Sequence, residues 1–127
     1  MIRRDYLLDQ LSLMAARGGS LLLPEGEGLF LYRPDRQGEG ASLGEGLCAL
    51  ARDGKINEAE DRLFAALEEG RSAAILEGGI RFYAFLLTLS RESLKVGGFT
   101  EEEIGEGFQD LLEEFGIRDI FFQGFPV

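Results

Sequence analysis

Two apolar stripes with the period of an α-helix meet at a glycine in the middle of this 127-residue chain. The first stripe comprises Leu43, Leu47, Leu50 and Ala51, and the second comprises Ile56, Ala59, Leu63, Ala66 and Leu67. Such spacing marks one face of an amphipathic helix. Gly54 lies between the stripes and supplies the left-handed backbone position that ends a helix. The segment from Leu47 to Gly70 therefore predicts the corner of an antiparallel helical hairpin.

The chain is long enough to bury a core without disulfides or metals, because 45% of its residues are hydrophobic. We expect one helical domain over residues 1–127. The net charge of −10 is uneven: residues 1–40 carry 5 basic and 6 acidic groups (−1), and residues 41–127 carry 8 and 17 (−9). Binding to phosphates needs a basic face, so this balance argues against nucleic acid and anionic membranes as partners.

Reactive side chains are scarce. The chain has no histidine, which removes Ser-His and Cys-His nucleophiles and imidazole metal ligands. Cys48 is the one cysteine, so no intramolecular disulfide forms, and we expect a buried, inert thiol. No run approaches the roughly 18 apolar residues of a membrane span, and Asp9 and Gln10 interrupt the first apolar run, which makes a poor signal peptide. We expect a cytoplasmic protein without cofactor, metal or catalytic residues.

Three further helices are expected around the hairpin. One runs from about Arg3 to Arg17 and ends at Gly18-Gly19. Another begins after a Ser72 cap and is apolar on so many sides that we expect it at the centre of a bundle. Its Gly78-Gly79 pair should weaken it by roughly 1 kcal/mol per glycine unless a neighbouring helix packs there.

The clearest local signal lies near the C-terminus. Thr100 and Glu103 form a capping box, and the helix that it begins should end at Gly116. Ser90 is expected to cap a short turn before it. Together these signals predict an all-α bundle of about five helices.

Two regions do not fit the helical pattern. In residues 20–42, the short apolar runs 21–23 and 29–32 flank Pro-Glu-Gly-Glu-Gly, which permits a β-hairpin with a loop of about five residues or an irregular loop with apolar ends. Residues 118–127 form an aromatic tail that either lies across the bundle or reaches a partner.

Two sequence features resemble functional sites, a calcium-binding loop and a cluster of catalytic or metal-binding carboxylates. Residues 53–60 resemble the second half of a calcium loop, but Ala49 and Ala51 would occupy two positions that need oxygen ligands, so the calcium reading fails. Several carboxylates could form an acid/base or two-metal pair, although most lie on the expected outer faces of helices: Glu58, Asp61, Glu68, Glu69, Glu103, Glu106 and Asp110.

Parts of the sequence resemble two groups of known proteins. Gly54, Ala59, Leu63 and Ala66 follow the spacing of the helical hairpin in tetratricopeptide repeats, although no second unit recurs. The chain also resembles a family of short, uncharacterised bacterial proteins, through Asp5-Tyr6 and the segments 50–64, 82–83, 99–107 and 115–117. That resemblance implies an all-helical fold and offers no activity, cofactor or site residue to carry over.

The leading hypothesis is a non-enzymatic module for protein–protein interaction or homo-oligomerisation. It uses apolar residues outside the helical stripes: Leu29, Phe30, Tyr32, Ile120, Phe121, Phe122 and Phe125. The alternatives are a small carboxylate-based or metal-dependent enzyme, which requires two acids with raised pKa values in one pocket, and a binder of an apolar ligand near Phe82–Phe85.

Overall fold

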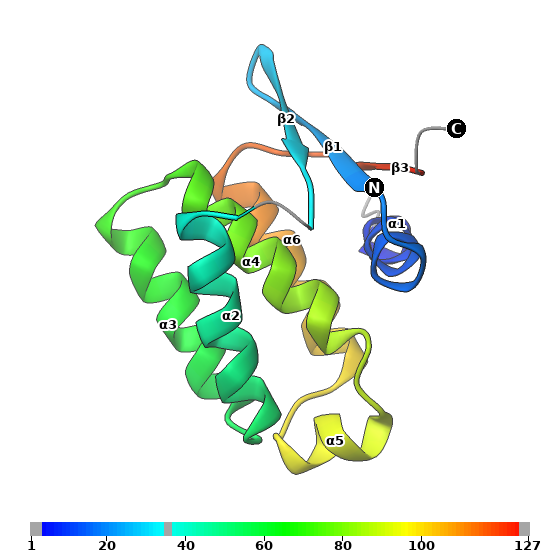
Figure 1. The fold of residues 1–127 in the computed structure, drawn as a ribbon, viewed down its shortest axis with the longest axis vertical. Coiled ribbons are helices and arrows are strands. Elements are labelled where there is room, and N and C mark those ends of the chain that lie inside the picture. Colours follow the sequence, from blue (N-terminus) through cyan, green and yellow to red (C-terminus); the bar gives the residue numbers. More distant parts are fainter. Residues whose placement is uncertain (1–3, 35–36, 125–127) are drawn as a thin grey trace.

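The computed structural model describes residues 4–34 and 37–124. Over these residues the chain forms, in order, α1 (Arg4–Arg17), β1 (Ser20–Glu25), β2 (Gly28–Tyr32), α2 (Glu39–Arg52), α3 (Ile56–Glu69), α4 (Ala73–Leu86), α5 (Arg91–Val96), α6 (Glu101–Glu114) and β3 (Phe121–Gln123). The strands form a small sheet at the end of α2, α3, α4 and α6 that is opposite α5 (Figure 1). The prediction of a mostly helical fold is confirmed, but with six helices and a small sheet in the described residues the fold is α+β and not an all-α bundle of about five helices.

The helical hairpin is confirmed. Helix α2 ends at Arg52, Gly54 has φ +79°, and α3 begins at Ile56 and packs back on α2. The Lys55 N–H donates to the Leu50 carbonyl at 2.9 Å, which satisfies one of the free carbonyls at the end of α2. Ala59 and Leu63 are fully buried, so the apolar stripe of α3 faces the interior as its spacing predicts.

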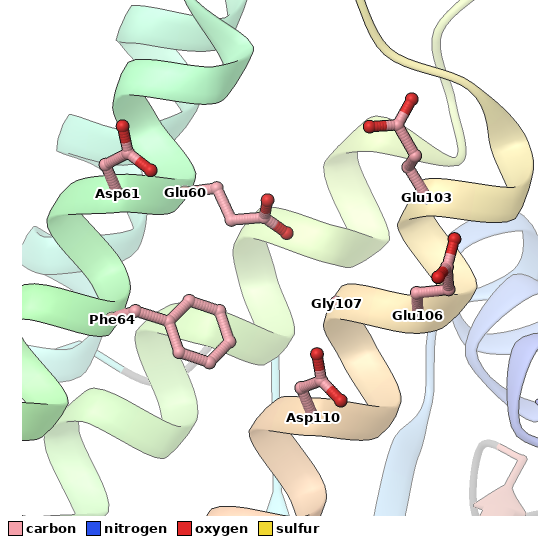
Figure 2. A pocket seen from close by; sticks show the side chains of 7 residues that line it. All are labelled: Glu60, Asp61, Phe64, Glu103, Glu106, Gly107 and Asp110. Atoms are coloured by element: carbon pink, nitrogen blue, oxygen red, sulfur yellow. The ribbon is translucent and has the colours of Figure 1, made fainter.

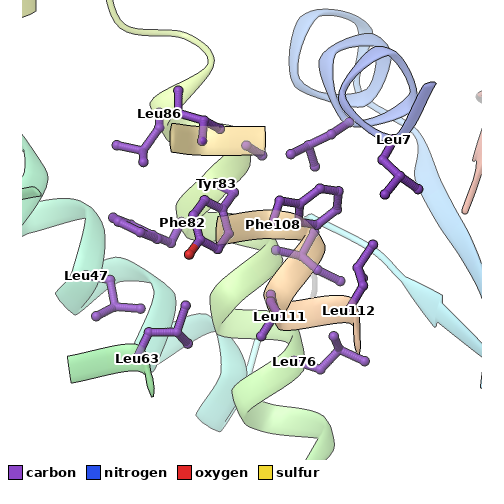
Figure 3. Packing of buried hydrophobic residues seen from close by; sticks show 14 of the residues in the cluster. Leu7, Leu47, Leu63, Leu76, Phe82, Tyr83, Leu86, Phe108, Leu111 and Leu112 are labelled. Atoms are coloured by element: carbon purple, nitrogen blue, oxygen red, sulfur yellow. The ribbon is translucent and has the colours of Figure 1, made fainter. Parts of the chain in front are cut away.

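Helix α4 is the central helix, as its apolar circumference predicts. It packs against α1, α2, α3 and α6, and Figure 3 shows its side chains between those of the surrounding helices. Its fully buried members include Leu76, Ile80, Phe82, Tyr83 and Leu86. A Cβ built at Gly78 would lie 2.8 Å from Cδ2 of Leu43, and one at Gly79 would lie 2.6 Å from Cδ2 of Leu111. Both glycines therefore sit where a neighbouring helix packs closely.

The close approach of Leu111 to Gly79 leads to a prediction about stability. We expect Gly79→Ala to lower the free energy of unfolding by about 1 kcal/mol, because the cost of overpacking against Leu111 exceeds the gain in helix propensity. The matched control is Gly46→Ala on α2, where a Cβ meets nothing within 4 Å, and there we expect a gain of about 0.5–1 kcal/mol. Urea titration followed by far-UV circular dichroism measures both; a gain at both positions would contradict the close packing of α4.

The two regions that fit no helix form the sheet, in the order β2-β1-β3 with both pairings antiparallel. Residues 20–32 are a β-hairpin, but its loop has two residues, Gly26 and Glu27, instead of about five. Gly26 has φ +58° and Glu27 a negative φ, which is the pattern of a type II′ turn. Pro24 fits within β1 because β3 pairs only as far as Leu22, so no strand needs the missing N–H.

The predicted helix caps are confirmed at Ser72, Ser90 and Thr100, whose hydroxyl oxygens accept from backbone N–H groups three residues on. The turn expected after Ser90 is a full short helix, α5. None of the helices in the described part of the chain is long and apolar enough to span a membrane.

Candidate functional site

The two faces of the sheet differ in what covers them. Leu21, Leu23 and their cross-strand partners Tyr32, Phe30 and Phe122 face the helices and pack in or against the core. The alternate residues point away from the helices, because side chains alternate along a strand. Ser20 and Gln123 lie on this outer side at one end, and we call its apolar members the outer sheet face: Leu22, Pro24, Leu29, Leu31 and Phe121.

The outer sheet face is apolar and partly open to solvent. Leu29 is 73% exposed and Phe121 39%, and together with Val96 on α5 they are the large hydrophobic residues classed as exposed in the described part of the chain. Phe121, Leu22 and Leu31 lie in one row across the three strands. A clustered apolar patch of this kind is typical of interaction sites.

The described residues among those proposed from the sequence separate into three groups, and Phe125 stands apart. Leu29 and Phe121 lie on the outer sheet face, whereas Phe30 and Phe122 are half-buried on the opposite face. Tyr32 and Ile120 are buried, at 2% and 0% exposure, and contribute to the core. Phe125 lies outside the described residues. Sequence reasoning missed Leu22, Pro24 and Leu31, because the continuous apolar runs 21–23 and 29–32 hide the alternation that would separate the two faces.

The edges of the sheet differ as well. At the β3 edge, the Phe122 N–H donates to Oε1 of Gln10 on α1 at 2.8 Å, so that helix covers the edge. Strand β2 forms the other edge, and among the described strands it pairs only with β1. Residues 28–32 contain no charged residue and no proline. The devices that normally protect an exposed edge strand are therefore absent from β2 itself.

A second feature is an acidic groove of about 330 Å³ between α3 and α6. Its lining is shown in Figure 2: Glu60, Asp61 and Phe64 from α3, and Glu103, Glu106, Gly107 and Asp110 from α6. Four of the carboxylates proposed from the sequence meet here, namely Asp61, Glu103, Glu106 and Asp110. Glu58 instead pairs with Arg62 at 3.1 Å, and Glu68 and Glu69 are exposed outside the groove.

Glu60, which lines the groove, makes a hydrogen bond to Tyr83 that sequence reasoning missed. The hydroxyl of buried Tyr83 on α4 donates to Oε2 of Glu60 at 2.6 Å. Burial raises the pKa of Glu60, the Tyr83 hydrogen bond opposes that rise, and the charges of Glu103, Asp61 and Asp110 add to it. Burial and the Glu60 charge also raise the pKa of Tyr83. A buried tyrosine hydroxyl needs a hydrogen-bond partner, so the expected burial of Tyr83 could have indicated that such a partner exists. The sequence does not indicate which residue that partner is.

The groove meets the requirement of the carboxylate-enzyme hypothesis only in part. The raised pKa belongs to Glu60, which hydrogen-bonds a tyrosine and not a second carboxyl. In residues 4–34 and 37–124, no three His, Cys, Asp or Glu side chains are grouped so that they could hold a metal ion.

The comparison with family models matches residues 1–116 to DUF6483, a family of unknown function. The chain belongs to the DUF6483 family. Comparisons with curated proteins and with solved structures give no match. The DUF6483 match ends at Gly116, directly after α6 and its C-terminal turn. The hairpin β1–β2 and the acidic groove thus lie inside the family segment, whereas Phe121 and β3 lie after it.

A further cavity in this DUF6483 chain, of about 300 Å³, is lined partly by Tyr32, Cys48, Arg81 and Phe85. Arg81 donates to Glu45 at 2.8 Å and to the Pro34 carbonyl, so its guanidinium is already paired. Burial raises the pKa of the Cys48 thiol to about 11, which keeps it protonated and a poor nucleophile. Of the two phenylalanines named for an apolar-ligand site, Phe85 lines this cavity and Phe82 is fully buried. The hypothesis that the chain binds an apolar ligand stays a prediction.

Proposed function

We propose that this DUF6483 protein is a non-enzymatic module that self-associates through its three-stranded sheet. The single observation that carries the proposal is the placement of Leu29: it is 73% exposed, on an apolar face, in the edge strand β2, which among the described strands pairs only with β1. Exposed apolar side chains favour association because burial removes their surface from water, and the backbone groups of an edge strand favour it because a second strand can hydrogen-bond them.

The charge distribution supports a second copy as the partner. The outer sheet face has no charged side chain, and the hairpin around it carries only Glu25, Glu27 and Arg33, whereas five carboxylates line the groove between α3 and α6. Two copies that met through α3 and α6 would bring like charges together, and such contacts are unfavourable. Contact through the hairpin avoids this repulsion. The resemblance of the α2–α3 hairpin to a tetratricopeptide unit stays a prediction, and here that hairpin serves as scaffold.

Sedimentation velocity over a range of protein concentrations tests the proposal. We expect the wild-type chain to form a larger species as concentration rises, and Leu29→Lys to raise the dissociation constant by about tenfold or more, because lysine on an edge strand opposes pairing. Val96→Lys is the matched control: Val96 is 81% exposed on α5, away from the sheet, and we expect no change there. A wild-type chain that stays monomeric, or equal effects of both substitutions, would defeat the proposal.

A further inference from the structure

We infer that two copies of this chain join by antiparallel pairing of their β2 strands, with Phe30 of each copy at the two-fold axis, into one continuous six-stranded sheet. This inference rests on the proposed self-association and specifies its geometry. A competing geometry exists, in which two outer sheet faces stack on each other without any strand pairing. Edge pairing is supported by the backbone directions, the strand length and the charges that flank β2.

The directions of the backbone groups follow from one hydrogen bond between α1 and the sheet. Because the Phe122 N–H donates to Gln10, it points away from β1. Phe122 is opposite Leu21, so Leu21 belongs to a pair that is not hydrogen-bonded to β3, and its own N–H and C=O face β2. Tyr32 is opposite Leu21, and successive residues alternate, so the backbone groups of Leu29 and Leu31 point outward from the β2 edge.

The length of β2 then selects a register. The outward groups of Leu29 and Leu31 must meet outward groups on the second copy, which excludes a shift by one residue. A strand of five residues is fully paired with its own copy only when Phe30 lies opposite Phe30. In that register Leu29 lies opposite Leu31 on the outer sheet face, and the two half-buried Phe30 side chains meet on the inner face. The most exposed leucine of the sheet therefore gains an apolar neighbour.

The charges at the two ends of β2 agree with this register. Glu27 precedes the strand and Arg33 follows it, and both are exposed. When Phe30 lies opposite Phe30, residue 27 of one copy lies beside residue 33 of the other, so the dimer contains two Glu27–Arg33 contacts of opposite charge. Opposite charges across paired strands are favourable, and like charges there are unfavourable.

Charge reversal tests both the pairing and its register. At low salt, where exposed pairs are least screened, we expect Glu27→Arg and Arg33→Glu each to raise the dissociation constant by about 5- to 30-fold, because each variant places two like-charged pairs at the ends of the joined strands. The double variant Glu27→Arg/Arg33→Glu exchanges the two charges and restores opposite pairs. We expect its dissociation constant to return to within about threefold of the wild-type value.

The outcomes separate this inference from the proposed function. If the wild-type chain associates and Leu29→Lys abolishes association, but the three charge variants behave as the wild type does, the copies stack face to face and the edge-pairing inference is overturned. Weakening by both single variants without recovery in the double variant also overturns it, because the register is then wrong. A wild-type chain that is monomeric at every concentration defeats the inference and the proposed function together. Circular dichroism melting curves verify that each variant is folded.

Discussion

Phe108→Ala is expected to lower the free energy of unfolding by about 3–5 kcal/mol, the range for truncating a buried aromatic residue. Phe108 is fully buried on α6, and its ring lies 6.0 Å from the ring of Tyr83 on α4, tilted by 54°. Figure 3 places it among side chains of the central cluster. Truncation would remove this contact and leave a cavity between α6 and α4, so the loss would be a large share of the roughly 5–15 kcal/mol that holds a domain of this kind folded.

Phe121→Ala is the matched control for Phe108→Ala. Phe121 is 39% exposed on the outer sheet face, so its truncation is expected to change stability by less than about 1 kcal/mol. Urea titration followed by far-UV circular dichroism measures both variants at a concentration low enough to keep the chain monomeric. Equal losses at the two positions would mean that α6 does not contribute to the core as described.

The helices could be predicted because their signals are local. The caps at Ser72, Ser90 and Thr100 each satisfy an N–H group within the same turn, and Gly54 lies between the end of one helix at Arg52 and the start of the next at Ile56. Each signal lies within a few residues of the structure that it controls. The tertiary contacts of the folded chain agree with the helices that these local signals predict.

The sheet could not be predicted in the same way. Leu21–Leu23 is a continuous apolar run, so its sequence does not show that Leu22 faces outward while its neighbours are buried. The loop was expected to be longer because Pro24 and Glu25 look like turn residues, yet both belong to β1. The β1–β3 pairing joins Ser20 to Gln123, and no local pattern in the tail indicates which distant segment it meets.

The candidate sites were predicted unevenly for related reasons. Leu29, Phe121, Tyr32 and Ile120 all lie outside the helical stripes, so that criterion does not separate the exposed pair from the buried pair. Burial of Tyr32 and Ile120 depends on which face of the sheet each residue takes, and that is settled by packing against the helices. Glu60 was missed because it lies between buried Ala59 and exposed Asp61, so its sequence position does not show whether it is buried. Its hydrogen bond depends on Tyr83 of α4, which is distant in the sequence.

Tyr83→Phe is expected to lower the free energy of unfolding by about 1.5–3 kcal/mol at pH 7, the usual cost of losing a hydrogen bond to a charged group. The hydroxyl of Tyr83 is the donor to Glu60 at 2.6 Å, and Glu60 is half-buried. The fit around this bond is tight, since a Cβ at Gly107 would overlap both the Tyr83 hydroxyl and the Glu60 carboxylate. Phenylalanine would leave the carboxylate in the groove without its donor.

The loss should depend on pH in a definite direction. The pKa of Glu60 in the folded chain is raised above its ordinary value of 4.5, chiefly by burial. An acid with a raised folded pKa costs no stability below its unfolded pKa, and stability falls as pH rises through the folded value. The Tyr83 hydroxyl holds that pKa down, so its removal raises the pKa further and enlarges the cost at pH 7. We therefore expect Tyr83→Phe to lose more stability at pH 7 than at pH 4.

A double-mutant cycle with Glu60→Gln tests this cause. Glutamine cannot ionise, but its amide oxygen still accepts from the Tyr83 hydroxyl. In the Glu60→Gln background we expect Tyr83→Phe to cost only about 0.5–1.5 kcal/mol, the value for a neutral hydrogen bond, and to cost the same at both pH values. If Tyr83→Phe were equally damaging at pH 4 and pH 7 in the wild-type background, the hydroxyl would not act by stabilising the ionised form of Glu60, and the proposed cause would be wrong.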